Sequence, residues 1–391
     1  MEKKKKICFV VAQPGTAKSF FKEPIKVLSQ HYDIYLAANI KDTDDLSDMN
    51  LAGYRSIPIE RRPSIKDDIK ALKLLTAYFK EMKFDAVHSM SKKASLLTTI
   101  AGRVAKIPYR LHHFTGQMWC VMTGLKKLFY KHMDTFIVWS DTHLLVDGES
   151  QRDYLIQTGI LKEGQATVLG KGSICGINTQ RFYKNEETRK QIRDELKLSD
   201  DKVVYIFLGR LKREKGAYEL FDAFNQMAAS CQNAVLLLVG ADEEKCMDRL
   251  DEYPNLKNGD NVIYYGYTQK PEDLYNASDV YVLPTYREGF GLSILEASAT
   301  GLPVITSDTY GVRDSIVENE TGLRCKTYDV ETLKDCMIRL YNHADERKRL
   351  GQNGIKYVQD YFTIEKICGA WLEYYLTLIP QHYNLTLFIS S

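Results

Sequence analysis

The clearest chemical signal in the sequence is a run of acids and glycines at residues 288–296. It reads Glu288-Gly289-Phe290-Gly291-Leu292-Ser293-Ile294-Leu295-Glu296. Glycines before a helix let backbone N–H groups approach an anion closely, and the helix dipole favours negative charge there. A carboxylate beside such a site, as at Glu288, is suited to accept hydrogen bonds from hydroxyl groups. Glu296, in the first helical turn, is placed to reach the two hydroxyls of a ribose.

A capped helix start is the simpler interpretation of part of this run. Ser293 and Glu296 have the spacing of a capping box, in which two side chains satisfy backbone N–H groups at the start of a helix. The two glycines would then serve only a tight turn. For Glu296 alone we favour the cap, whereas two acids and two glycines at one turn favour a binding site for the whole run.

Cationic side chains mark a second turn, which reads Gly209-Arg210-Leu211-Lys212-Arg213-Glu214-Lys215-Gly216. Arg210 and Lys215 bracket a loop between a predicted strand and a predicted helix. Arginine engages phosphate oxygens with a planar fork, and lysine supplies a point charge. A solvated basic turn is the simpler interpretation. Its position at the end of a strand, in the same predicted sheet as Glu288, favours an anion site.

The elements that would position these turns follow from short apolar runs that alternate with longer amphipathic stretches. In the first half we predict strands at Ile7–Ala12, Asp33–Ala38, Phe84–His88, Tyr109–Phe114, Asp134–Trp139 and Gln165–Gly170, and helices at Asp67–Met82, Lys92–Ala105 and His143–Gly159. In the second half we predict strands at Lys202–Leu208, Ala234–Val239, Asn261–Tyr265, Asp279–Leu283 and Leu302–Thr306, and helices at Ala217–Ala229, Ser293–Thr300, Val330–His343, Glu346–Tyr361 and Thr363–Leu378.

Continuous Val, Ile and Leu runs indicate strands that are covered on both faces, and their alternation with helices predicts doubly wound parallel sheets. The charged segment 183–202 separates the two halves. We therefore expect an α/β protein with two Rossmann-like domains, 1–184 and 185–370, and a terminal segment, 371–391. Ligands of such sheets bind at the carboxyl ends of the strands, so both turns should face a cleft between the domains.

Taken together, these motifs resemble those of the retaining glycosyltransferases of family 4, which have the two-domain GT-B fold. The resemblance rests on Gly209-Arg210 with Lys215-Gly216, and on Glu288-Gly289-Phe290-Gly291 with seven residues between Glu288 and Glu296. The segments 277–284, 301–305 and 319–323 also match, and the resemblance extends over essentially the whole chain. Within the family, residues 110–119 resemble the subgroup that acts in bacterial capsule and O-antigen assembly.

The resemblance implies a role for each matching residue. Arg210 and Lys215 would hold the diphosphate of the donor, Glu288 and the following backbone would hold the donor sugar, and Glu296 would bind the ribose. The final helix would cross back onto the first domain. The implied catalytic residues are Glu288, Arg210 and Lys215, and the implied donor-binding residues are Gly15, Arg210, Lys215, Glu288, Gly289, Phe290, Gly291, Leu292 and Glu296.

Gly15 follows the first predicted strand, where the family keeps a glycine loop near the donor phosphates. A nucleotide P-loop is the alternative interpretation, because Lys18-Ser19 follow. Both glycines of that motif are missing, however, since Ala12 and Ala17 stand in their places. We therefore reject the P-loop.

Candidate contacts to the sugar or the acceptor come from two further strand ends of the first half. Many relatives carry His directly before the glycine of the segment 110–119, where this chain has Thr115. His112 and His113 lie on opposite faces of one strand, so at most one of them faces the cleft. After the strand that ends at His88 come Ser89, Lys92 and Lys93. The contacts that we predict are His113, Thr115, Gly116 and Lys93.

We expect neither a metal nor another cofactor. Asp42-Thr43-Asp44-Asp45 spells a DxD motif, which holds a divalent ion in the other large transferase fold. Here the motif lies in a polar stretch that predicts a solvated loop. Arg210, Lys215 and a helix N-terminus would neutralise the diphosphate instead.

Composition narrows the class of protein further. Of the 391 residues, 44% are hydrophobic and 27% are charged, which excludes a disordered or fibrous chain. No apolar run is long enough for a transmembrane helix, and a net charge of +2 gives no support for a nucleic-acid partner. Eight scattered cysteines without CxxC spacing indicate free thiols in a reducing cytoplasm.

Basic segments of the first half predict peripheral contact with anionic lipid on the inner face of the cell membrane. Each basic residue near such a surface contributes about 1 kcal/mol. Solvated helices of an ordinary domain are the alternative. The segments are Lys3–Lys6, the face with Lys66, Lys70, Lys73, Lys80 and Lys83, and Leu125-Lys126-Lys127-Leu128-Phe129 with Lys131.

The resemblance implies transfer of a sugar from a nucleotide-diphosphate sugar, with UDP as the commoner base, to a glycan or a polyprenyl-diphosphate-linked saccharide. The anomeric configuration would be retained by attack on the face that the diphosphate leaves. A nucleotide-sugar 2-epimerase or a glucan synthase of the same fold is one alternative. A protein that binds a nucleotide sugar without catalysis is the other, and the intact set Arg210, Lys215, Glu288 and Glu296 argues against it.

Overall fold

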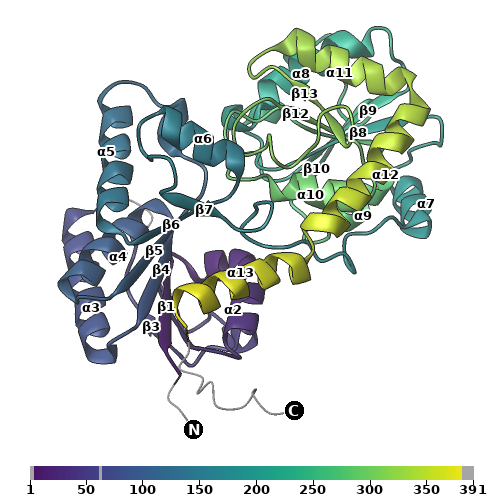
Figure 1. The fold of residues 1–391 in the computed structure, drawn as a ribbon. Coiled ribbons are helices and arrows are strands. Elements are labelled where there is room, and N and C mark those ends of the chain that lie inside the picture. Colours follow the sequence, from purple (N-terminus) through teal and green to yellow (C-terminus); the bar gives the residue numbers. More distant parts are fainter. Residues whose placement is uncertain (1–3, 61–63, 381–391) are drawn as a thin grey trace, which may run out of the picture.

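The structure is a computed structural model that describes residues 4–60 and 64–380. Two lobes, each built on one sheet, lie side by side (Figure 1). The first lobe holds a seven-stranded sheet of order β3-β2-β1-β4-β5-β6-β7, in which every pairing is parallel. Its strands are β1 (Lys6–Val10), β2 (Asp33–Ala38), β3 (Gly53–Ser56), β4 (Ala86–Met90), β5 (Tyr109–Phe114), β6 (His143–Val146) and β7 (Ala166–Val168).

Helices of the first lobe cover both faces of this sheet, as the nearly continuous burial of its central strands requires. The α-helices are α1 (Pro14–Phe20), α2 (Lys22–Leu28), α3 (Ile65–Met82), α4 (Lys92–Val104), α5 (Gly124–Ser140) and α6 (Glu149–Gln157). Two short 3₁₀ turns are η1 (Ser47–Met49) and η2 (Met118–Val121).

The second lobe repeats this architecture with a six-stranded parallel sheet of order β10-β9-β8-β11-β12-β13. Its strands are β8 (Val203–Leu208), β9 (Ala234–Val239), β10 (Val262–Gly266), β11 (Val280–Leu283), β12 (Val304–Ser307) and β13 (Gly322–Cys325). Its helices are α7 (Glu186–Glu195), η3 (Arg213–Lys215), α8 (Ala217–Ala228), η4 (Cys246–Glu252), α9 (Pro271–Ala277), α10 (Leu292–Ala299), α11 (Val330–Asn342) and α12 (Ala344–Tyr361). The architecture is the doubly wound α/β fold with two lobes that the sequence predicts.

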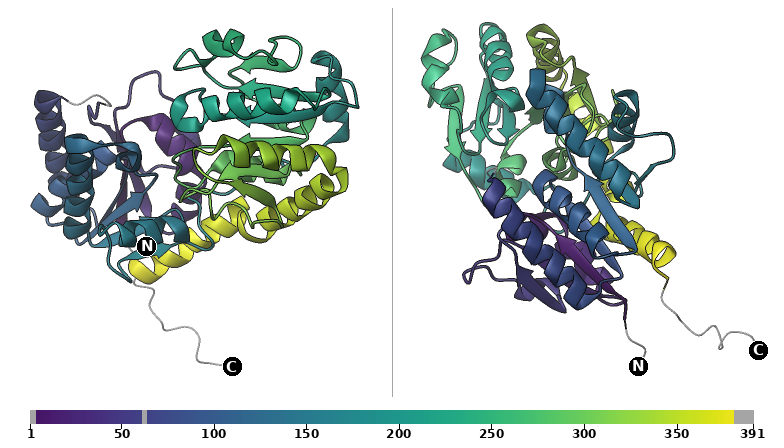
Figure 2. Two further views of the ribbon diagram at one scale, coloured as in Figure 1. Left: turned by 90° about the horizontal axis from the view of Figure 1, so that it is seen from above. Right: turned by 90° about the vertical axis from the view of Figure 1, so that its left-hand side faces the viewer.

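The last helix, α13 (Ile364–Leu378), follows the second lobe in the chain but packs against α2 of the first (Figures 1 and 2). Trp371 stacks at 5.2 Å on the His88 ring, and its Nε1 donates to the carbonyl of Ile174. Tyr32 Oη donates to the carbonyl of Tyr375, whose own hydroxyl lies 2.6 Å from His88 Nδ1. The core of the first lobe therefore includes the last helix. The remainder of the expected terminal segment, 381–391, lies outside the described residues.

The chain crosses between the lobes twice, and the two crossings touch. The first crossing follows β7, and the expected boundary between residues 184 and 185 falls just before α7. Ile177 in this crossing donates its N–H to Phe362 and accepts from Ile364. A Cβ on Gly176 would lie 2.3 Å from Ile364 Cα, so only glycine allows this approach.

Two predictions about elements of the first lobe are wrong. The predicted strand Asp134–Trp139 is the end of α5, although its Thr, Phe, Ile, Val and Trp favour strands. Asp134, Ile137 and Ser140 are the buried residues of α5, so the 3.6-residue period decides against the propensity. The predicted helix His143–Gly159 is β6 followed by α6, because the extended backbone at Gly148 separates them. Most other predicted elements are confirmed to within a few residues at their ends, while β3 and β13 are short strands that no prediction covers.

The prediction of free thiols is confirmed. All eight cysteines are unpaired, and five of them, Cys8, Cys231, Cys246, Cys325 and Cys368, are buried.

Candidate active site

A cavity of about 470 Å³ lies where the carboxyl ends of the two sheets face each other, and residues of both lobes line it. We call it the donor pocket, after the ligand that the sequence predicts for it. The predicted residues that line it are Thr115, Gly116, Arg210, Lys215, Glu288, Gly289, Phe290, Gly291 and Leu292. Residues that sequence reasoning did not single out for the site also line it, namely Phe20, Asp147, Ile174, Glu214, Arg287 and Ser293.

The turn after β8 brings Lys215 to the pocket. It ends at Gly216, which has a φ of 76° and directly precedes α8. A Cβ there would lie 2.1 Å from the Pro284 carbonyl oxygen, so glycine lets this turn pack against the chain that leaves β11. As a result, Lys215 Nζ forms an ion pair with Glu288 Oε1, and both side chains are largely buried. The two residues predicted as catalytic from separate motifs are in direct contact.

Arg210 lines the same pocket from a more exposed position. Its side chain is 53% exposed and forms an ion pair with Glu243 at 3.2 Å. A guanidinium in this position is accessible to a diphosphate in the pocket, and its fork can bind two phosphate oxygens at once.

The acidic and glycine-rich run follows β11 as predicted, but its helix start is not a capping box. Gly291, at a φ of 84°, precedes α10, and no side chain caps that helix. Ser293 Oγ instead accepts a hydrogen bond from Tyr281, and Glu296 accepts one from Tyr275. The cap that we favoured for Glu296 is therefore wrong.

Glu296 is partly buried and does not line the pocket. Burial raises the pKa of its carboxyl to about 7 against the hydrogen bond from Tyr275 Oη, which lowers it. The carboxyl of Glu296 therefore changes between its protonated and its ionised form near neutral pH.

Arg287 joins the two lobes at the edge of the pocket. One end of its guanidinium donates to the carbonyl of Gly116 in the first lobe at 3.1 Å, and the other donates to Glu214 at 2.6 Å. A Cβ on Gly116 would lie 2.8 Å from the backbone of Glu288, so the two lobes meet here backbone to backbone. Arg287 directly precedes Glu288, but its partner lies 171 residues away, and no local pattern reveals that contact.

Asp147 is a buried carboxylate in the pocket wall. Its Oδ1 lies 3.0 Å from His113 Nε2, and a Cβ on Gly289 would lie 2.5 Å from its Oδ2. Sequence reasoning missed Asp147 because the helix predicted over 143–159 hid the end of β6. His113 itself stacks on Trp371 and does not line the donor pocket.

The other predicted contacts lie elsewhere. Gly15 is in the first turn of α1 and has open space around it, away from the lining. Lys93 forms an ion pair with Asp68 at 2.7 Å. His112 and His113 are both buried, and burial together with the neighbouring His113 lowers the pKa of His112 to about 3.

A second contact between the lobes lies beside the donor pocket, at the start of α6. Asp314 Oδ2 accepts from both the backbone N–H and the hydroxyl of Ser150, each at 2.8 Å. Tyr154 stacks face to face on Tyr310 at 4.1 Å, and the Tyr310 hydroxyl accepts from the N–H of Gln117. The second lobe thereby provides a hydrogen-bond acceptor for a backbone N–H group at the start of a helix of the first lobe.

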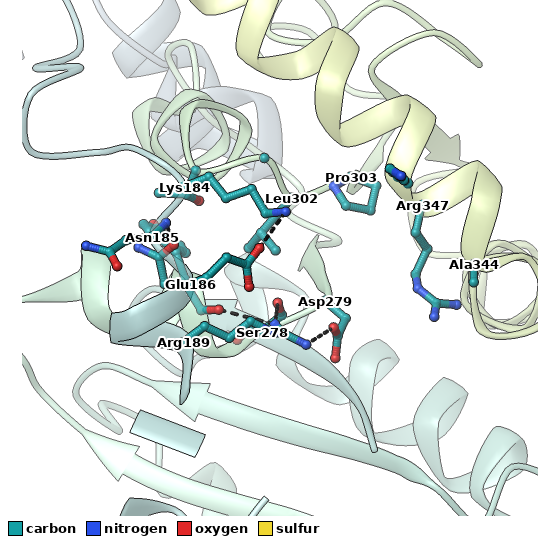
Figure 3. Close-up of a pocket in the computed structure, with 15 residues that line it drawn as sticks. Lys184, Asn185, Glu186, Arg189, Ser278, Asp279, Leu302, Pro303, Ala344 and Arg347 are labelled. Atoms are coloured by element: carbon teal, nitrogen blue, oxygen red, sulfur yellow. Dashed lines mark hydrogen bonds and ion pairs between the residues drawn. The ribbon is translucent and has the colours of Figure 1, made fainter. Parts of the chain in front are cut away.

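A further cavity, of about 250 Å³, lies at the opposite end of the second sheet (Figure 3). Asp279 and Pro303 line it just before β11 and β12 begin. Arg189 is paired there with Asp279 at 2.6 Å, and Lys184 with Glu186 at 2.7 Å. Because ligands of parallel sheets bind at the carboxyl ends of strands, this cavity is not the candidate active site.

Within residues 4–60 and 64–380, no group of three or more His, Cys, Asp or Glu side chains is arranged to hold a metal ion. The DxD segment is a loop in which Asp44 accepts from the N–H of Lys41 and Asp45 from that of Ser47. None of the helices in these two ranges is both long and apolar enough to span a bilayer.

Comparisons with known proteins show what the chain is similar to. Residues 188–357 match the model of the glycosyl transferases group 1 family. The chain is 31% identical over 327 residues to a capsular polysaccharide biosynthesis glycosyltransferase of Staphylococcus aureus. The aligned residues make up 83% of this chain and 85% of the relative. It is 27% identical over 290 residues, 72% of either chain, to the Escherichia coli UDP-Gal:alpha-D-GlcNAc-diphosphoundecaprenol alpha-1,3-galactosyltransferase. The sucrose-phosphate synthase of Thermosynechococcus elongatus has the same fold, with a TM-score of 0.79 and 21% identity over 96% of this chain and 99% of that one.

Proposed function

Because the chain belongs to the group 1 glycosyl transferases, we propose that its two lobes bind a nucleotide-diphosphate sugar and pass the sugar to a saccharide of a bacterial surface polysaccharide. The observation that carries this proposal is the ion pair of Lys215 and Glu288 in a 470 Å³ pocket between the two sheets. It combines a cation for a diphosphate with a carboxylate for sugar hydroxyls at the place where parallel sheets bind ligands.

The donor lies with its diphosphate against Arg210 and Lys215, and with its sugar against Glu288 and the backbone of 289–292. Glu296 and Gly15 do not line the pocket, so their contacts with the donor require the nucleotide to extend beyond it. Uracil is the base that we propose, since the galactosyltransferase relative is named for a UDP sugar.

In the reaction, the bond between the anomeric carbon and the diphosphate breaks as the acceptor oxygen forms a new bond on the same face. The acceptor proton passes to the departing phosphate oxygen. Lys215 and Arg210 stabilise the negative charge that grows on the diphosphate, an effect that typically amounts to about 10²–10³ in rate for one contact. This step uses neither a metal ion nor another cofactor.

The acceptor that we propose is a saccharide linked through a diphosphate to a polyprenyl lipid, the kind of acceptor named for the galactosyltransferase relative. Such an acceptor is embedded in a membrane. The enzyme would then work on the inner face of the cell membrane, in the cytoplasm, with no part for nucleic acid.

The outer face of α5 supports contact with a membrane. Leu125 is 84% exposed, Phe129 61% and Trp139 67%, although they are large apolar side chains. Lys126, Lys127 and Lys131 stand among them in the sequence. An apolar face bordered by lysines suits the boundary between the head groups and the acyl chains of anionic lipids. We call this surface the α5 patch.

A thermal-shift screen of nucleotide sugars tests the proposal first, because a donor that binds the folded protein raises its melting temperature. The best donor is then incubated with a sugar linked to a short prenyl diphosphate, and the product and its anomeric configuration are identified by NMR. A retained glycosidic product supports the proposal. Conversion of the donor without an acceptor would indicate an epimerase, and donor binding without any turnover a binding protein.

A further inference from the structure

A small polar cavity of about 20 Å³ lies in the first lobe beside the donor pocket. It sits between the ends of β4 and β5 and the inner face of α5, and Thr115 and Gly116 line both cavities. By volume it holds about one water-sized group. It can therefore take an oxygen atom of a ligand whose remaining atoms lie in the larger pocket.

Four residues that line the cavity have a buried polar atom without a hydrogen-bond partner in the described part of the chain. These atoms are Ser91 Oγ, Lys92 Nζ, His112 Nδ1 and His113 Nδ1. The two histidines are only 4% and 1% exposed. A buried polar group without a partner costs about 1–3 kcal/mol, so a ligand oxygen that enters the cavity and bonds to Ser91 Oγ or Lys92 Nζ would be stabilised there.

Lys92 and the start of a helix supply positive charge on one side of the cavity. Lys92 is the first residue of α4, a helix of 13 residues whose N-terminus has no side-chain cap. The partial positive charge of a helix N-terminus adds to that of the lysine. Asp134 is the acidic group in the wall, and its Oδ2 accepts from Trp119 Nε1 at 2.6 Å.

Backbone geometry points to the same place. Ser91 has a φ of 76°, which serine rarely adopts, and this conformation turns the chain from β4 directly into α4. Such strained residues cluster at ligand sites because the surrounding structure holds them there.

The cavity also lies between the donor pocket and the α5 patch. Lys92 Nζ stands 4.9 Å above the ring of Tyr130, and that ring packs at 5.5 Å against Phe129 of the patch. A lipid chain on the patch, a charged group at Lys92 and a saccharide in the donor pocket would thus follow one another in space.

We propose that this cavity binds a phosphate oxygen of the acceptor's diphosphate, with Lys92, Ser91 and the start of α4 as its ligands. This inference rests on the proposed function and assigns its acceptor a site. Lys92 acts as a positioning residue, since it fixes where the saccharide hydroxyl meets the donor rather than taking part in bond making.

Two acceptors with the same saccharide test this site, one on a short prenyl diphosphate and one on an alkyl chain of equal length without phosphate. With the wild-type protein, we expect kcat/KM to be about 10- to 100-fold higher for the diphosphate acceptor, since one or two charge-assisted hydrogen bonds distinguish them. In Lys92→Met this preference disappears, while the rate with the alkyl acceptor and the KM for the donor stay within about twofold. Ser91→Ala weakens the preference less. Lys190→Met, on the exposed side of α7, is the matched control.

The other outcomes distinguish a failure of the phosphate site from a failure of the proposed function. Equal kcat/KM for both acceptors in the wild type overturns the phosphate site but leaves the transferase intact, whereas no transfer to either acceptor with any donor overturns the proposed function. A rise in the donor KM of Lys92→Met would assign the cation to the donor, and a loss of vesicle binding would assign it to lipid head groups. Either of these two results would overturn the proposed phosphate site. If Lys92→Met does not fold, Ser91→Ala decides alone.

Discussion

Lys215 and Glu288 are joined by an ion pair between two loops that lie 73 residues apart in the sequence. The lysine comes from the turn after β8, and the glutamate from the turn after β11, the neighbouring strand of the sheet. Each side chain therefore holds the other at the pocket wall. In the function that we propose, a diphosphate would bind Lys215 as a cation already in place, and Glu288 would keep its position for a sugar hydroxyl.

Removing either partner should abolish most of the activity without unfolding the protein. For Lys215→Ala and Glu288→Ala we expect kcat to fall by about 10²–10³. The first variant loses a cation beside the diphosphate, and the second loses a hydrogen bond to the donor sugar. Steady-state kinetics with saturating donor measure this effect, and circular dichroism checks the fold. Lys190→Ala is the control. Rates near the wild-type value in both variants would end the assignment of this pocket.

Gly116→Ala tests whether the contact between the lobes matters for the reaction. The new methyl group would lie 2.8 Å from the Glu288 backbone, so the lobes must move apart by several tenths of an ångström. A misplacement of about 1 Å can cost about 10²-fold in rate, so we expect kcat to fall, but by less than this. Gly369→Ala in α13 is the matched control, since a Cβ there has no neighbour within 4 Å. An unchanged kcat in Gly116→Ala would show that this approach is dispensable.

The buried carboxyl of Glu296 should make stability depend on pH. Its pKa is about 7 in the folded chain and near 4.5 when unfolded, so the native state binds the extra proton between these values. Stability from this group is complete below about pH 4.5 and is lost as the pH rises through 7. The free energy of unfolding of Glu296→Gln minus that of the wild type should therefore increase by roughly 2–3 kcal/mol between pH 5 and pH 8.

Urea unfolding of both proteins at pH 5 and pH 8 measures this difference. Comparison of the two chains is needed because burial also raises the pKa of Asp141 to about 7, and that residue titrates in both. A difference that does not change with pH would contradict an elevated pKa at Glu296.

Membrane contact should depend on the α5 patch. We expect the protein to float with vesicles that contain anionic lipid, and to float less at high salt because ions screen the lysines. The double variant Leu125→Glu/Phe129→Glu should lose binding at every salt concentration, since it places charge where apolar side chains enter the lipid. Tyr267→Glu, at a 75% exposed position of the second lobe, is the control. Equally strong binding to neutral vesicles would contradict a contribution of the lysines to membrane binding.

Much of the fold and part of the site follow from the sequence. The strands β2 and β5 have the predicted bounds, and the turns after β8 and β11 carry Lys215 and Glu288 to one pocket, because parallel strands bring their ends to one edge. Gly15, Glu296, His113 and Lys93 do not line that pocket, and their roles remain predictions.

The residues that sequence reasoning missed depend on contacts between distant segments. Arg287 acquires its place from the Gly116 carbonyl of the opposite lobe, which no local pattern encodes. Asp147 was hidden because a strand of four residues, β6, is too short to stand out from the helix that follows it. Glu296 has the spacing of a cap, but Tyr275 provides a closer partner from another helix.

The double crossing between the lobes has a consequence for recombination. Because α13 completes the core of the first lobe, a chimera that takes its donor-binding half from another enzyme needs two junctions, one before α7 and one before α13. Ile177 is hydrogen-bonded to residues 362 and 364, so the two linkers should descend from the same parent. A single splice would replace Trp371 as well, and would place the last helix of the other enzyme against His88 of this chain.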